Sequence, residues 1–219
     1  MQALLPERLP ESAWCDGYAL PDGRIALAVA DVADRGPKSA ALLAKVRRTL
    51  RAAVLDPEHP AAVVRAVDDV VRAHDSAPMV AAIFGLIDPA NATVSYAASA
   101  VPASVPILRR ALQRYAAGLG LDDERRYALI TAVGEAMANA VEHAYTDRPG
   151  VVRLNLAASP EELRVTIEDD GRWKAAQYCE ERGRGLGLMR SLMDGVEICT
   201  GGPQTAIRLR LAWKRPATP

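Results

Sequence analysis

A segment of small residues and prolines divides this chain into two parts of similar length. Residues 97–106 read Ala-Ala-Ser-Ala-Val-Pro-Ala-Ser-Val-Pro and follow neither the period of a helix nor that of a strand. Apolar residues recur with both periods on either side of this segment. A chain of 219 residues has room for one large or two small domains. We therefore predict one domain over residues 1–105 and a second over residues 106–219.

Composition excludes several classes of protein. The chain has 27 basic and 27 acidic side chains, so a nucleic-acid coat or a polybasic membrane anchor finds no support. Its three cysteines are widely spaced without a CxxC pair, which argues against a disulfide framework or a zinc site and fits a reducing compartment. No signal peptide is evident, and the longest apolar run, Met79 to Ile87, is too short to span a bilayer. We expect a cytoplasmic protein with no direct nucleic-acid or membrane partner.

Apolar spacing predicts an α+β protein. The first part reads strand, helix, helix, strand, strand, and the second reads helix, helix, hairpin, short helix, hairpin. Asp122 is the expected N-cap of the longest helix, which would run to about Tyr145. The expected elements of the first part are Arg24–Ala30, Ser39–Leu55, Ala61–Ala73, Met79–Asp88 and Ala92–Ala98. Those of the second part are Leu108–Leu119, Asp122–Tyr145, Val151–Ala157, Leu163–Glu168, Leu188–Asp194, Val196–Thr200 and Thr205–Ala212.

A first polar cluster lies on the longest predicted helix. Glu135 and Asn139 are four positions apart, so they lie one above the other, beside the apolar stripe of the helix. A carboxylate can accept a proton or order a water, and an amide oxygen can complete the shell of a Mg²⁺ ion that also binds phosphate oxygens. An ordinary solvated helix face has the same pattern, so the cluster alone leaves both interpretations open.

Two further clusters contain glycine. A predicted strand ends in Asp169-Asp170-Gly171, where a carboxylate could accept the exocyclic amine of a purine; many simple turns share this pattern. Gly183, Gly185 and Gly187 precede a predicted helix, where backbone N–H groups could approach phosphate oxygens. This third stretch has neither the Gly-Lys-Ser/Thr of a Walker A loop nor a directly preceding strand. A loop without a ligand is its alternative.

The order and spacing of the three clusters resemble the GHKL ATPases, whose ATP-binding fold is called Bergerat. More narrowly, residues 106–213 resemble the small anti-sigma-factor serine kinases of bacteria. The matching stretches are EAMANAVEHAY (135–145), DDGRW (169–173) and GRGLGLMRSLMD (183–194). The resemblance implies a C-terminal α/β sandwich with a mixed sheet and ATP with Mg²⁺ as cofactors.

The resemblance also implies a role for each matching residue. Glu135 would be the general base that takes the proton from a serine hydroxyl, and Asn139 would complete the Mg²⁺ shell with the phosphates of ATP. Asp169 would receive the adenine amine, with Thr205 a weaker neighbour of the base. Arg182 and Arg184 are candidates for steadying the γ-phosphate, although arginines in such a stretch are more often solvated. The pocket and phosphate lid would be formed by Gly171, Gly183, Arg184, Gly185, Leu186 and Gly187.

The first part resembles the metal-dependent serine/threonine phosphatases of the SpoIIE type. The resemblance is carried by residues 1–10 together with residues 14–36, where Asp31 falls on the second of two early metal-ligand positions. The first of these positions holds Ala13, and the acidic segments that close the family's domain are absent. One aspartate cannot hold two hard cations that need about six oxygens each. We therefore expect a partial, degenerate phosphatase-like α/β domain that serves docking, dimerisation or regulation.

These features lead to two hypotheses of different classes. In the first, the protein is an ATP-binding anti-sigma factor and serine kinase that phosphorylates a STAS-type antagonist; its family implies a homodimer. In the second, it is a non-catalytic ATP-binding partner-switching module with a pseudophosphatase regulatory half. A histidine-kinase role is disfavoured because no dimerisation helix with an accessible phosphoacceptor histidine precedes the ATP-binding part. His143 is better explained as a packed or capping residue.

Overall fold

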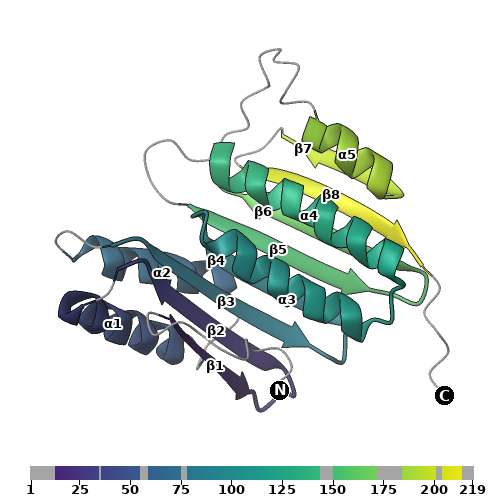
Figure 1. The fold of residues 1–219 in the computed structure, drawn as a ribbon. Coiled ribbons are helices and arrows are strands. Elements are labelled where there is room, and N and C mark those ends of the chain that lie inside the picture. Colours follow the sequence, from purple (N-terminus) through teal and green to yellow (C-terminus); the bar gives the residue numbers. More distant parts are fainter. Residues whose placement is uncertain are drawn as a thin grey trace.

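The computed structural model describes residues 13–34, 36–54, 59–74, 78–143, 150–171, 184–200 and 204–213. Within these ranges the chain alternates short groups of strands and helices (Figure 1). The strands are β1 (Ala13–Ala19), β2 (Ile25–Val32), β3 (Val80–Asp88), β4 (Thr93–Ser99), β5 (Val151–Ala158), β6 (Glu162–Asp169), β7 (Gly195–Cys199) and β8 (Thr205–Ala212). The helices are α1 (Pro37–Ala53), α2 (Pro60–Arg72), α3 (Ser104–Gly118), α4 (Asp123–His143) and α5 (Arg184–Leu192).

The strands form one eight-stranded sheet in the order β1-β2-β3-β4-β5-β6-β8-β7. Each neighbouring pair of described strands is antiparallel, so the expectation of a mixed sheet is wrong. Two described helices join β2 to β3, and two more join β4 to β5. After each pair of helices the next strand runs antiparallel to the strand before them. Between β6 and β7 the described residues form one helix, α5, and these two strands run in the same direction but are separated by β8.

The sheet is continuous across the segment where the sequence predicts a domain boundary. β4, from the first part, pairs with β5, from the second, over the register Thr93↔Ala157 to Ser99↔Val151. β4 runs to Ser99 and α3 begins at Ser104, so most of residues 97–106 are regular structure. Residues 97–101 are all buried, and a strand covered on both faces shows no alternation of apolar and polar residues. The division at residue 105 itself stays a prediction.

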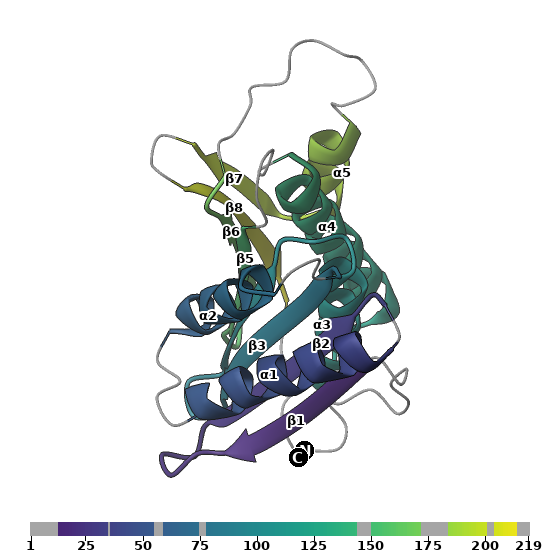
Figure 2. The ribbon, with the colours of Figure 1, turned by 90° about the vertical axis from the view of Figure 1, so that its left-hand side faces the viewer.

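Helices cover both faces of the sheet and define two cores. α1 and α2 lie on one face, and α3, α4 and α5 lie on the other (Figure 2). α3 belongs to the second part but packs over strands of the first, because Leu27 and Ile83 share a core with its Leu108 and Leu112. The largest fully buried side chains of this core include Leu129, Met137, Leu154, Leu156, Leu163 and Ile167.

β1, the edge strand of the sheet, is not among the elements predicted from the sequence. Its Trp14 and Tyr18 pack toward α1 and α2, but the residues between them are Cys15, Asp16 and Gly17, and six of its seven residues are half-buried. A strand without clear alternation gives no period-two signal. None of the described helices is both long and apolar enough to cross a membrane.

Candidate nucleotide site

Helix α4 positions Glu135 and Asn139. The helix begins after Asp122, whose carboxylate accepts a hydrogen bond from the Arg125 backbone N–H at 2.8 Å, so the predicted N-cap is present. Its inward face is buried at Leu129, Ala132, Val133, Ala136 and Ala140. Glu135 and Asn139 lie at the border of this buried stripe and are half-buried. Their side chains are therefore held on a rigid element while remaining accessible from one side.

The first turn of α5 closes over these two side chains. A methyl group placed on Gly185 would lie 2.9 Å from Glu135 Oε2 and 3.8 Å from Asn139 Nδ2. Only glycine lets the backbone approach the carboxylate this closely without a shift of one of them. The structure thus brings Gly185 next to Glu135 and Asn139, which precede it by 50 and 46 positions in the sequence.

α5 begins at Arg184, four residues before the predicted start at Leu188. The low helix propensity of Gly185 and Gly187 favours a loop in a reading of the sequence alone. In the structure, Leu186 packs against the main core, and the buried Met189 and Met193 lie one and two turns further on. Tertiary packing therefore extends the helix through the glycines.

Gly187, two positions after Gly185, is not packed as closely as Gly185. A methyl group on Gly187 would meet no atom within 4 Å, so its packing gives no reason for glycine there. Gly183, Arg182 and the side chain of Arg184 lie outside the described residues, as does the side chain of His143. Their expected roles stay predictions.

A second group of predicted residues meets where β6 ends and β8 begins. Asp169, the last residue of β6, pairs with Thr205, the first residue of β8. Their exposed fractions are 6% and 3%, and both continue the sheet face that α4 covers. The backbone N–H of Gly171 donates to Asp169 Oδ1 at 2.8 Å. The structure thus holds a buried carboxylate, a hydroxyl and a turn glycine at one point.

Burial makes Asp169 a weaker acid than an ordinary aspartate. Loss of solvent raises its pKa to about 6, although the hydrogen bond from Gly171 acts in the opposite direction. Asp170 beside it raises the pKa further, and the Arg153 guanidinium lowers it. The carboxylate is therefore ionised at pH 7 and becomes protonated in mildly acidic solution. A buried, ionised carboxylate is a strong acceptor for an N–H donor.

The two groups lie at the same end of the molecule. α4 and β6 end there, and α5 and β8 begin there (Figure 1). The Glu135–Asn139–Gly185 group and the Asp169–Gly171–Thr205 group therefore border one region, on the face of the sheet that α4 covers. The start of α5 also points backbone N–H groups without intrahelical partners toward this end, which favours the binding of an anion there.

The residues that surround Asp170 are not among the site residues predicted from the sequence. This carboxylate accepts hydrogen bonds from Arg65 of α2 and Arg153 of β5, each at 2.6 Å, and from Gln204 at 3.3 Å. Arg65 is 105 positions away in the sequence. No local spacing could have indicated this contact.

In the first half, the structure places Ala13 and Asp31 opposite each other; these are the two positions where the SpoIIE resemblance implies metal ligands. Ala13 of β1 pairs directly with Asp31 of β2, so the position that lacks its carboxylate lies next to the aspartate that remains. Among the described residues, no three His, Cys, Asp or Glu side chains gather closely enough to hold a metal ion. Loss of phosphatase activity stays a prediction.

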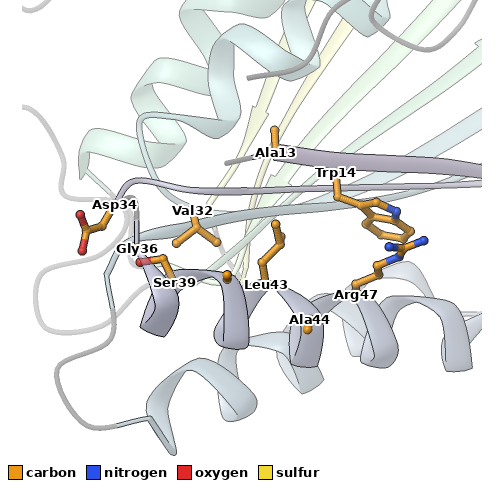
Figure 3. Close-up of a pocket in the computed structure, with 10 residues that line it drawn as sticks. Ala13, Trp14, Val32, Asp34, Gly36, Ser39, Leu43, Ala44 and Arg47 are labelled. Carbon is orange, nitrogen blue, oxygen red and sulfur yellow. The ribbon is translucent and has the colours of Figure 1, made fainter. Parts of the chain in front are cut away.

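A cavity of about 480 Å³ lies in the first half, between β1 and α1 (Figure 3). The Arg47 guanidinium lies 5.2 Å from the centre of the Trp14 ring at one end, and Asp34 lies at the other. The cavity is on the face of the sheet opposite α4, so it is separate from the candidate nucleotide site. It was not anticipated because it forms against β1, a strand that the sequence did not predict.

Two protein-family models match the chain. The model described as "Histidine kinase-like ATPase domain" matches residues 98–211. The model "Stage II sporulation protein E (SpoIIE)" matches residues 21–128. The two matches overlap over α3 and the start of α4, which agrees with a sheet and core that continue across the middle of the chain.

Curated proteins similar to this chain include several kinases. Blue-light-activated histidine kinase 2 of Erythrobacter litoralis is 34% identical over 94 residues, which cover 39% of this chain and 27% of that protein. Serine-protein kinase RsbW of Bacillus subtilis is 31% identical over 116 residues, which cover 45% of this chain and 72% of RsbW. Anti-sigma F factor of Thermoanaerobacter pseudethanolicus is 29% identical over 114 residues, which cover 46% of this chain and 80% of that protein.

The chain therefore spans about a quarter of the histidine kinase and about three quarters of the shorter relatives. A solved structure of the RsbU and RsbW domains of a Mycobacterium tuberculosis protein has a TM-score of 0.43 and 17% identity, and covers 98% of this chain and 93% of that one. Because one family model covers more than half of the sequence and RsbW matches over most of its length, the chain belongs to the histidine kinase-like ATPase domain family.

Proposed function

We propose that this protein is an ATP-binding anti-sigma factor and serine protein kinase. It would phosphorylate a STAS-type antagonist and thereby control the release of a sigma factor, acting as a homodimer in the cytoplasm. The observation that carries the proposal is that Glu135, Asn139 and Gly185 meet at the end of the molecule where the buried Asp169 also lies. The 31% identity to RsbW over 72% of its length supports the same class.

The residues present fit ATP with Mg²⁺. The buried carboxylate of Asp169 suits the exocyclic amine of adenine, and Thr205 lies beside it. Asn139 offers one amide oxygen, and a Mg²⁺ ion bound there would take its remaining ligands from phosphate and water. When bound, Mg²⁺ would neutralise charge on the phosphates. The close approach of Gly185 to α4 leaves the backbone at the start of α5 near the phosphates.

Glu135 is the proposed general base. Its carboxylate lies against the backbone of Gly185, at the border of the site, where it can hydrogen-bond to a serine hydroxyl that approaches from solvent. Taking the proton from this hydroxyl as it attacks the γ-phosphate would make the serine oxygen a better nucleophile. The rest of the catalysis is positioning and charge neutralisation, as phosphoryl transfer requires.

The experiment that tests this function is transfer of label from γ-labelled Mg-ATP to a candidate STAS-type protein. We expect the label on a serine of that protein, and none on a variant whose acceptor serine is replaced by alanine. Tight Mg-ATP binding without transfer to any candidate would instead favour the non-catalytic partner-switching module. A pull-down in Mg-ATP and in Mg-ADP would then identify partners whose binding depends on the nucleotide.

The acidity of Asp169 predicts a pH dependence of nucleotide affinity. The ionised carboxylate accepts the adenine amine more strongly than the neutral acid does, and its pKa is raised to about 6, so affinity should fall as the pH drops below this value. Between pH 7 and pH 5 the ionised fraction falls roughly tenfold, so we expect a loss of ATP affinity of up to this factor from this one group. Calorimetric titrations across this range measure it.

The matched control is Asp169→Asn, which cannot titrate. Its affinity should change with pH only as the phosphates of the nucleotide do, without the additional step near pH 6. An identical pH profile for the native protein and this variant would show that Asp169 does not contact the base in its ionised form.

A further inference from the structure

An ion-pair network joins the SpoIIE-like half to the nucleotide site. Arg65 Nη2 on α2 lies 2.6 Å from Asp170 Oδ2, and Arg153 Nη2 on β5 lies 2.6 Å from Asp170 Oδ1. Gln204, just before β8, donates to the same Oδ1 at 3.3 Å. Asp170 is the residue directly after Asp169, the proposed adenine acceptor.

The Arg153–Asp170 pair of this network is largely buried, whereas Arg65 is about half exposed to solvent. The side chains of Arg153 and Asp170 are 16% and 26% exposed, whereas that of Arg65 is 49% exposed. Burial acts to raise the pKa of Asp170, but hydrogen bonds from Arg153 and Arg65 outweigh it and hold the pKa below its usual range. Asp170 is therefore ionised throughout the neutral range, and its contacts are charge-assisted.

The two neighbouring aspartates serve opposite faces of the sheet. Asp169 continues the face of Ile167 and Val165, which α4 covers. Asp170 contacts Arg153, whose neighbour two positions back, Val151, belongs to the core under α2. The chain at residues 169–171 thus has one carboxylate in the nucleotide site and the next one fixed by α2.

α2 is itself firmly placed. Val63, Val64 and Val67 are buried against the sheet, and Asp68 accepts a hydrogen bond from Ser99 Oγ at 3.4 Å at the end of β4. Arg65 therefore extends from a helix that cannot easily shift relative to the strand ends. A contact from such a helix limits how residues 169–171 can move.

We propose that Arg65 is a positioning residue for adenine recognition: by holding Asp170, it orients Asp169 toward the exocyclic amine of the base. This inference rests on the proposed ATP binding and adds to it that the SpoIIE-like half supports base selection through α2. The first half then takes part in base selection through α2.

The test compares Arg65→Ala with a matched control on the same helix. Arg72→Ala also removes an arginine of α2, but one that pairs with Asp69 in an exposed ion pair. For each variant of the full chain, calorimetry gives the Kd for Mg-ATP and for the triphosphate of purine riboside, which lacks the 6-amino group. We expect Arg65→Ala to weaken ATP about three- to fivefold, the range of one ion pair, and to leave the amine-free analogue unchanged.

The controls separate positioning from folding. Arg72→Ala should change neither affinity, Arg65→Lys should restore part of the ATP affinity, and Arg65→Ala should add little in an Asp170→Asn background. Equal weakening of ATP and of the amine-free analogue would assign Arg65 a merely structural role, and unchanged ATP affinity would overturn the proposal directly. If the native protein binds neither nucleotide, the proposed function fails first and this inference fails with it.

Discussion

Replacing Glu135 by glutamine should slow serine phosphorylation by at least a hundredfold and leave ATP binding within about twofold of the native value. Glutamine keeps the shape of the side chain against Gly185 but cannot take a proton from the serine hydroxyl. A positioned general base contributes about 10²- to 10⁴-fold to such a reaction, so the turnover number should fall by this factor. Label transfer measures the rate, and calorimetry with Mg-ATP measures the affinity.

Glu135→Ala is the companion variant, and it should also lose transfer. Glu142→Gln is the matched control, because it changes a carboxylate of the same helix that lies outside the Glu135–Asn139–Gly185 group. Its transfer rate should stay near the native rate. Retention of transfer by both Glu135 variants would show that another group acts as the base, or that none is needed.

Asp169→Asn should have the largest effect on nucleotide affinity. Gly171 N–H donates to Oδ1 in the native protein, and it would hold the carbonyl oxygen of asparagine at the same place. The NH₂ group would then occupy the other position and oppose the adenine amine, donor against donor. A hydrogen bond to a charged acceptor contributes about 1.5–3 kcal/mol, so the Kd for ATP should rise about 10- to 150-fold.

Asp69→Asn provides the comparison for this variant. Asp69 is an exposed aspartate of α2 that pairs only with the exposed Arg72 among the contacts described for it, and its loss should leave the Kd unchanged. The affinity for purine riboside triphosphate should fall little in Asp169→Asn, because that nucleotide offers no amine. A Kd for ATP within twofold of the native value would contradict the placement of adenine at Asp169.

Local patterns predicted most elements of this fold. The Asp122 cap, the apolar stripe of α4 and the alternation in β8 are determined by residues close in sequence, and the structure has all three. β1 was missed because its half-buried residues carry no alternation. α5 was predicted four residues too late because packing of Leu186 and Met189 outweighs the low helix propensity of the glycines.

The arrangement of the sheet was harder to predict. Residues 97–106 indicated a boundary, yet β4 pairs with β5 and α3 packs on strands from the first half. Short side chains such as those of Ala97 and Ala98 give little hydrophobic contrast, even where both faces of a strand are buried. Strand pairing between residues 52 to 64 positions apart depends on the whole core, which no local window contains.

In the candidate site too, local spacing predicted some contacts, whereas others depend on the fold. The spacing of Glu135 and Asn139 on one helix placed them together, and the structure adds Gly185 from α5. The pairing of Asp169 with Thr205 agrees with their expected neighbourhood around the base, although binding of adenine stays a prediction. The contact of Arg65 with Asp170 links residues 105 positions apart and could come only from the fold.

Calorimetric titration of the full chain with Mg-ATP, before and after Asp169→Asn, tests the nucleotide site most directly. We expect the native protein to bind one ATP per chain with a saturable heat, and the variant to bind at least tenfold more weakly. A native protein without saturable heat, or a variant with the same Kd as the native protein, would contradict the assignment of this site.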